Sequence, residues 1–147
     1  MRANRALFIE RSRIIEAACA AWEAENVEAV VADLGEEVDF SVNAPPDAAS
    51  FVGAGRGRAE LVRRLEAYLA GIKVMYFEAL LPITTRGDDA LHCRAHFLYR
   101  HRIKPLHIEG TMRHVWRFRD DRVLRLDVYY DAPRMRAFYD LIETLEA

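Results

Sequence analysis

The sequence has few cysteines and no long hydrophobic segment. Its 147 residues include two cysteines, Cys19 and Cys93, which are too few for a disulfide framework and form no metal site by themselves. No apolar run approaches the ~20 residues of a membrane-spanning helix. Residues 1–13 carry charges but lack the apolar core of a signal peptide. These absences predict a cytoplasmic protein with reduced thiols and no membrane partner.

Disorder and multiple domains are also excluded by composition and length. Hydrophobic residues make up 52% of the chain, at or above the ~45–50% usual in globular proteins. A chain of this length fits one domain, which we expect to span residues 1–147. No internal repeat or low-complexity segment interrupts it.

The net charge of −2 is distributed unevenly along the chain. Residues 1–50 hold ten acidic residues and four arginines, whereas residues 91–119 hold six arginines and one lysine against one glutamate. A basic region of this kind can bind nucleic acid or an anionic ligand. No basic helix or interleaved aromatic residues accompany it, so we favour a solvated sheet face and expect no nucleic-acid partner.

Hydrophobic periodicity predicts four helices. Asn26 can cap the second of them, a short helix that Gly35 would end. The predicted helices are Leu7–Ala24, Val27–Leu34, Arg58–Gly71 and Ala132–Leu145, the last of them capped by Asp131.

The stretch between the second and third helices is less regular. Alternation of Val38, Phe40 and Val42 with polar residues predicts a strand with one buried face, and residues 50–52 can add a short strand. The glycines of residues 53–57 predict a turn into the next helix. Phosphate binding by these glycines is disfavoured because Arg58 occupies the third glycine position of the dinucleotide motif.

After Gly71 the hydrophobic period changes from 3.6 to 2, which predicts four long strands. Their connections are short, so neighbouring strands are expected to be antiparallel hairpins, and the fold class is α+β. The predicted strands are Lys73–Thr85, Ala90–Ile103, His107–Arg119 and Val123–Tyr130.

Side-chain sizes predict the register of the central hairpin. Closing it around residues 104–105 places Tyr99 opposite Gly110 and Ala95 opposite His114, so that each large residue meets a small one. In this register one face of the sheet is apolar and concave, and the other is rich in arginine and histidine.

Four segments together resemble the NTF2-like superfamily, and within it the SnoaL-like branch related to ketosteroid isomerases and polyketide cyclases. They are Trp22–Leu34, Gly57–Leu61, Trp116–Asp120 and Tyr129–Asp131. The resemblance covers nearly the whole chain. It implies a cone-shaped, curved antiparallel sheet wrapped around three to four helices, with an internal apolar pocket. It also implies homodimers that pair through the outer sheet face.

Within this fold, His114 is the candidate acid–base residue, because it is the only histidine on the apolar face. Tyr99 and Tyr130 also point inward and can hydrogen-bond a ligand oxygen. Each of the three can instead be an ordinary core residue. The residues predicted to line the ligand pocket are Ala18, Trp22, Phe40, Val42, Asn43, Cys93, Ala95, Phe97, Met112, Trp116, Phe118, Leu126 and Val128.

The sequence departs from the ketosteroid isomerase pattern. His114 aligns with the protonated aspartate of their oxyanion hole, but their first-helix tyrosine aligns with Ala18, and their aspartate base aligns near Val42 and Asn43. The standard mechanism of those enzymes is therefore not expected. Asp47 is the nearest loop acid that can polarise His114.

Two functions remain open. The first is a cofactor-free isomerase, cyclase or dehydratase that moves a proton beside the carbonyl of a small, hydrophobic, cyclic compound. The second is a non-catalytic small-molecule-binding or dimerisation module. No metal is expected, since His92 and His96 on one strand lie ~13 Å apart, and both cysteines are predicted to be inert buried thiols.

Overall fold

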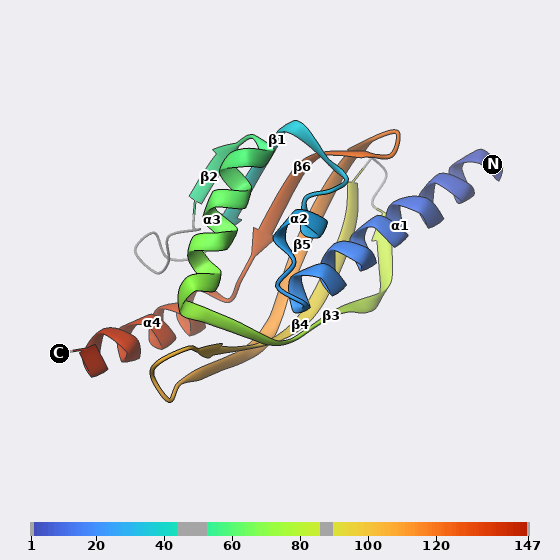
Figure 1. Cartoon of the computed structure of the whole chain (residues 1–147). Helices are drawn as coiled ribbons and strands as arrows, with labels where there is room; N and C mark the ends of the chain where they lie inside the picture. The colour runs from blue at the N-terminus through green and yellow to red at the C-terminus, as the bar shows by residue number, and fades with distance from the viewer. Residues whose placement is uncertain (1, 44–52, 86–89, 147) are drawn as a thin grey trace.

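The computed structural model describes residues 2–43, 53–85 and 90–146. A curved, unclosed six-stranded sheet forms the body, and α1, α2 and α3 lie against it, as predicted for a mixed α+β fold (Figure 1). The helices are α1 (Arg2–Glu23), α2 (Val27–Val30), α3 (Arg58–Gly71) and α4 (Ala132–Glu146). The strands are β1 (Leu34–Asn43), β2 (Gly53–Arg56), β3 (Ile72–Thr85), β4 (Ala90–His101), β5 (His107–Arg119) and β6 (Arg122–Tyr129).

The strand order is β2-β1-β6-β5-β4-β3. The predicted antiparallel run from β3 to β6 is confirmed. The expectation of a wholly antiparallel sheet is wrong at one place, because β1 pairs with β6 in parallel. This pairing joins the first strand to the last, and the intervening chain supplies the long crossover that a parallel pair needs.

The predicted register of the β4–β5 hairpin is wrong by two residues. Phe97, not Tyr99, lies opposite Gly110, and Cys93, not Ala95, lies opposite His114. The chain leaves the sheet early because the Arg102 guanidinium donates to the Leu69 carbonyl at 2.6 Å and pairs with the Glu25 carboxylate. A shift of two preserves the face of every side chain, so the inward-facing residues are those predicted.

The short helix and the glycine segment also differ from prediction. Asn26 caps α2, accepting from the Ala29 N–H at 3.2 Å, but the helix ends at Val30 and Gly35 lies inside β1. Residues 53–56 form β2 rather than a turn. β2 lies at the edge of the sheet, where its antiparallel pairing with β1 stabilises it. The strand predicted at residues 50–52, Asp47 and the connection at residues 86–89 lie outside the described residues.

The β1–β2 pair requires glycine at position 55. A Cβ atom on Gly55 would lie 2.4 Å from Cζ of Phe40, and the Phe40 ring is buried at 2% exposure and cannot easily move aside. Gly55→Ala is therefore expected to destabilise the protein by about 1–3 kcal/mol. Urea unfolding measures this loss, with Gly71→Ala as the control because a Cβ there meets nothing within 4 Å. Equal midpoints for the two variants would contradict the prediction.

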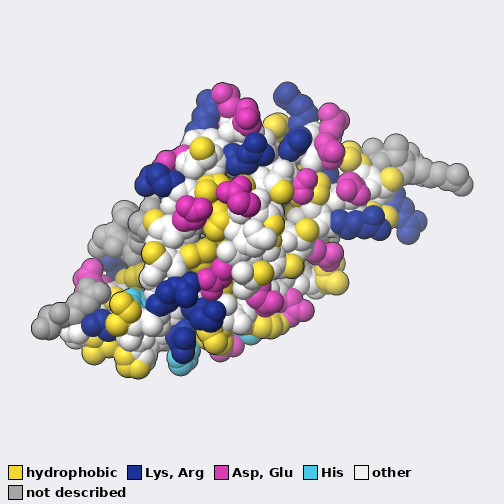
Figure 2. Space-filling model, viewed as in Figure 1, with side chains coloured by type: hydrophobic (Ala, Val, Ile, Leu, Met, Phe, Trp, Pro, Cys, Tyr) yellow, Lys and Arg dark blue, Asp and Glu magenta, His cyan; other side chains and the backbone are white. Residues whose placement is uncertain are grey.

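Charged side chains on the helical face are interspersed rather than segregated by sign (Figure 2). Many of them form local ion pairs, such as those of Arg63 and Arg64 with Glu60 on α3 and that of Arg56 with Glu37.

Within residues 2–43, 53–85 and 90–146, no helix is both long and apolar enough to cross a membrane.

Candidate functional site

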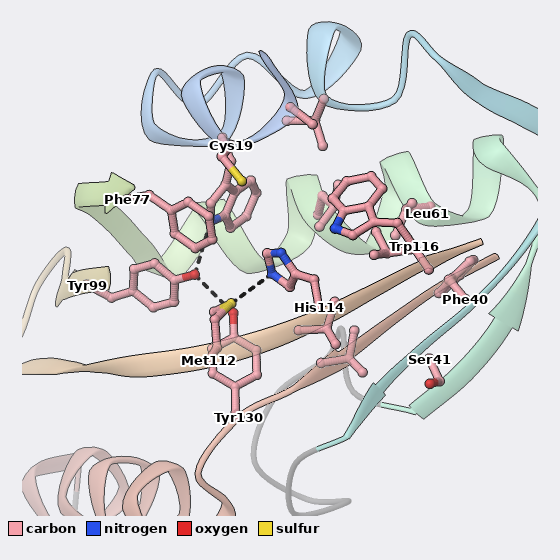
Figure 3. A pocket seen from close by; sticks show the side chains of 17 residues that line it. Cys19, Phe40, Ser41, Leu61, Phe77, Tyr99, Met112, His114, Trp116 and Tyr130 are labelled. Atoms are coloured by element: carbon pink, nitrogen blue, oxygen red, sulfur yellow. Dashed lines mark hydrogen bonds between the residues drawn. The ribbon is translucent and has the colours of Figure 1, made fainter. Parts of the chain in front are cut away.

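A cavity of about 80 Å³ lies between the concave face of the sheet and helices α1 and α3 (Figure 3). Drug-sized ligands occupy pockets of roughly 300–1,000 Å³, so this cavity fits only a compact molecule. Its wall consists of Ala18, Cys19, Trp22, Val30, Phe40, Ser41, Val42, Leu61, Leu65, Phe77, Tyr99, Met112, His114, Trp116, Leu126, Val128 and Tyr130.

His114 is the polar centre of this wall. It is 6% exposed, and its ring stacks on Phe77 with the centroids 6.0 Å apart. Its Nε2 lies 3.0 Å from Sδ of Met112. A thioether sulfur only accepts hydrogen bonds, so Nε2 carries the hydrogen and Nδ1 of the neutral ring holds the lone pair. Nδ1 is buried and has no hydrogen-bond partner among the described residues.

Trp116 lies two residues further along the same face of β5. Its ring meets that of His114 edge to face, with centroids 5.8 Å apart. The indole nitrogen edge turns toward the imidazole (Figure 3). Nε1 is buried and, in the part of the chain that the structure describes, unpartnered. An indole N–H can only donate. The cavity therefore combines one buried proton acceptor with one buried donor in apolar surroundings.

Three aromatic side chains form a hydrogen-bonded group at one end of the cavity. Trp22 Nε1 donates to the Tyr99 hydroxyl at 3.0 Å, and the hydroxyls of Tyr99 and Tyr130 are 2.9 Å apart. Burial raises the pKa of both Tyr99 and Tyr130 above the usual value of 10.0. Both phenols are therefore neutral at physiological pH and can donate hydrogen bonds, but they are not proton acceptors of useful strength.

Most of the predicted pocket residues lie on the cavity wall. His114, Tyr99 and Tyr130 do so, as do Ala18, Trp22, Phe40, Val42, Met112, Trp116, Leu126 and Val128. Among the described lining residues there is no carboxylate. Ala18 and Val42 are both on the wall. In ketosteroid isomerases the position aligned with Ala18 holds a tyrosine, and an aspartate base aligns near Val42.

Five residues predicted to line the pocket do not lie on its wall: Asn43, Cys93, Ala95, Phe97 and Phe118. Asn43 is exposed at the end of β1, where its amide donates to the Ser41 hydroxyl and the Val128 carbonyl. The other four are buried in the core. Phe97, for example, fills the space beside Gly110, and the Phe118 ring packs under the Arg11 guanidinium.

Sequence reasoning missed six wall residues: Cys19, Val30, Ser41, Leu61, Leu65 and Phe77. Leu61 and Leu65 were identifiable in principle, since they lie on the apolar face of the helix over residues 58–71. Phe77 was not, because the β3–β4 register shifts between Val74 and Tyr76 and the simple alternation fails there.

No group of histidine, cysteine and acidic residues able to hold a metal ion occurs among the described residues.

The fold is of the NTF2-like type. The structure superposes on an NTF2-like protein of unknown function from Burkholderia pseudomallei with a TM-score of 0.73 at 14% identity, covering 88% of this chain and 97% of that one. The sequence profile of the SnoaL-like domain matches residues 15–126. The chain therefore belongs to the SnoaL-like domain family.

Other solved structures share this architecture at low sequence identity. A provisionally named isomerase from Bacillus subtilis has a TM-score of 0.78 at 13% identity, covering 90% of this chain and 94% of that one. A provisionally named polyketide cyclase from Xanthomonas campestris has a TM-score of 0.73 at 14% identity, covering 88% and 96%. These similarities show the fold alone. The comparison with curated proteins finds no match.

Proposed function

We propose that this protein is a cofactor-free cytoplasmic enzyme that moves a proton beside the carbonyl group of a small, hydrophobic, cyclic compound, as an isomerase, cyclase or dehydratase. One observation carries the proposal: His114 Nδ1 and Trp116 Nε1 are both buried, unpartnered within the described chain and adjacent on the wall of an apolar cavity. The names of the structural neighbours, isomerase and polyketide cyclase, are consistent with this class of reaction.

In the proposed reaction the carbonyl oxygen accepts a hydrogen bond from Trp116 Nε1. His114 Nδ1 then takes a proton from the adjacent carbon, and negative charge develops on the oxygen beside the indole N–H. The apolar wall strengthens that interaction, because little water competes for the charge. Return of the proton to another atom completes an isomerisation. Tyr99 and Tyr130, as neutral donors, can bind a second oxygen of the substrate.

Proton exchange tests this chemistry without knowledge of the natural substrate. We expect the purified protein in D₂O to speed deuterium incorporation beside the carbonyl of cyclopentanone, a probe chosen for the small cavity, as followed by proton NMR. The reference is free imidazole at the same concentration. A rate no higher than that of imidazole, with no ketone binding, would overturn the proposal.

A non-catalytic binding module is the second candidate. It is favoured by the apolar residues Ala18 and Val42 and by the lack of a carboxylate among the described wall residues. The same NMR sample separates the two functions. A shift of the Trp116 indole N–H signal on ketone addition, without deuterium incorporation, would support binding alone.

We also propose that the protein forms a homodimer through the outer face of the sheet. Tyr76 is 37% exposed there and packs edge to face on His96, which leaves apolar surface available to a second copy. Reversing charge in the double variant Arg113→Glu and Arg117→Glu is expected to give monomers in sedimentation velocity. A matched reversal on the helices, Arg13→Glu with Arg63→Glu, is expected to leave the dimer intact. A monomeric wild-type protein would contradict this proposal.

A further inference from the structure

Outside β5, every side-chain nitrogen and oxygen on the described cavity wall has a hydrogen-bond partner within the protein. Trp22 Nε1 donates to the Tyr99 hydroxyl at 3.0 Å, and the hydroxyls of Tyr99 and Tyr130 pair with each other. The Ser41 hydroxyl donates to the Asp127 carboxylate at 2.6 Å. Among the described wall residues, the unmet requirement for hydrogen bonds is therefore confined to β5.

The two unmatched atoms on β5 have opposite hydrogen-bonding roles. His114 Nδ1 is an acceptor and Trp116 Nε1 is a donor, and their residues are 6% and 3% exposed. The two rings meet edge to face with centroids 5.8 Å apart, and the indole nitrogen edge faces the imidazole (Figure 3). A ligand that pairs with both atoms is favoured over one that pairs with a single atom, because an unpaired buried polar atom costs free energy.

The wall also selects for an uncharged ligand. Its described residues include no lysine, arginine, aspartate or glutamate. The hydrogen on Nε2 of His114 is donated to the neutral Met112 sulfur at 3.0 Å, so no carboxylate stabilises a charged imidazole there. An ionic ligand would lose its hydration in apolar surroundings without gaining a counter-ion.

We propose that the ligand of this cavity is a small, uncharged cyclic α-hydroxy ketone. Its carbonyl oxygen accepts a hydrogen bond from Trp116 Nε1, and its hydroxyl group donates one to His114 Nδ1. A ketone without the hydroxyl group pairs with the indole and leaves the imidazole nitrogen unmatched. Carboxylic acids carry both groups but are ionised at neutral pH.

The inference rests on the proposed function, because it names the substrate class of the same cavity. The hydroxyl group lies on the carbon that loses its proton in the proposed reaction. Its hydrogen bond therefore holds His114 Nδ1 beside that carbon before the proton moves.

A pair of probes that differ at one group tests the donor requirement. The full-length protein is titrated with 2-hydroxycyclopentanone and with 2-methylcyclopentanone, in which a methyl group of similar size replaces the hydroxyl. By isothermal titration calorimetry we expect the hydroxy compound to bind about 10- to 100-fold more tightly, although it is the less hydrophobic of the two. In nitrogen-15 NMR, the Nδ1 resonance of His114 is expected to move with the hydroxy compound and to stay nearly in place with the methyl compound.

Two variants assign the contacts. His114→Leu removes the acceptor, so the affinity ratio of the two probes is expected to fall to one or below while the methyl compound still binds. Trp116→Phe removes the donor that both carbonyls use, so both probes are expected to weaken alike and the ratio is expected to persist. Circular dichroism verifies the fold of each variant, and the Nδ1 shift in the wild type decides the matter if His114→Leu does not fold.

The outcomes separate this inference from the proposed function. No binding of either probe, equal binding of the two by the wild type, or an unchanged ratio in folded His114→Leu would each overturn the inference. Deuterium incorporation into cyclopentanone without a preference for the hydroxy compound would overturn the ligand class and leave the proposed function standing. A preference for the hydroxy compound without deuterium incorporation would support the ligand class and overturn the proposed chemistry.

Discussion

Replacement of His114 by glutamine is expected to lower the rate of deuterium incorporation into cyclopentanone by about 10²- to 10⁴-fold, the usual contribution of a positioned general base. Glutamine keeps a polar side chain of moderate size beside Met112, but its amide has no basic nitrogen. The measurement is the NMR exchange assay with equal concentrations of variant and wild-type protein. Because His114 packs against Phe77 and Trp116, urea unfolding of the variant verifies that the fold is retained.

The matched control for this change is His107→Gln. His107 is exposed at the start of the same strand, β5, so its loss alters the histidine content without altering the cavity. We expect the control to exchange at the wild-type rate. A His114→Gln variant that is folded and within twofold of the wild-type rate would rule out His114 as the base.

The free energy of unfolding is expected to fall steeply above pH 10. Tyr68 and Tyr99 are 3% and 0% exposed, and burial raises the pKa of both above 10.0. Below pH 10 the folded and unfolded chains both hold these phenolic protons, so the two tyrosines do not reduce the free energy of unfolding. Above pH 10 the unfolded chain releases them while the folded chain keeps them. Stability is then lost at about 1.4 kcal/mol per pH unit for each tyrosine, or roughly 3 kcal/mol per unit for the pair.

Urea unfolding at several pH values between 9 and 12, followed by far-ultraviolet circular dichroism and tyrosinate absorbance, measures this dependence. The double variant Tyr68→Phe with Tyr99→Phe serves as the control, since phenylalanine does not ionise, and its pH dependence is expected to be shallower. It is also less stable at neutral pH, because Trp22 Nε1 loses its acceptor. Unchanged unfolding midpoints between pH 9 and pH 11 in the wild type would contradict the prediction.

Local pattern in the sequence determined the elements and their buried faces. Residues 58–71 and 107–119 have the predicted bounds, because amphipathic periodicity is a property of neighbouring residues and needs no tertiary partner to be recognised. The same reasoning identified His114 and Trp116 as inward-facing. A strand has a period of two, so this assignment survived a hairpin register that was wrong by two residues.

Contacts between distant segments were decided only by the tertiary structure. The register followed from Arg102 binding Glu25 and the Leu69 carbonyl, and the β2 strand from the fit of Gly55 against Phe40. The lone pair on Nδ1 of His114 follows from the position of the Met112 sulfur. No local pattern in the sequence predicts these features, because each depends on how side chains from separate elements fill one shared interior.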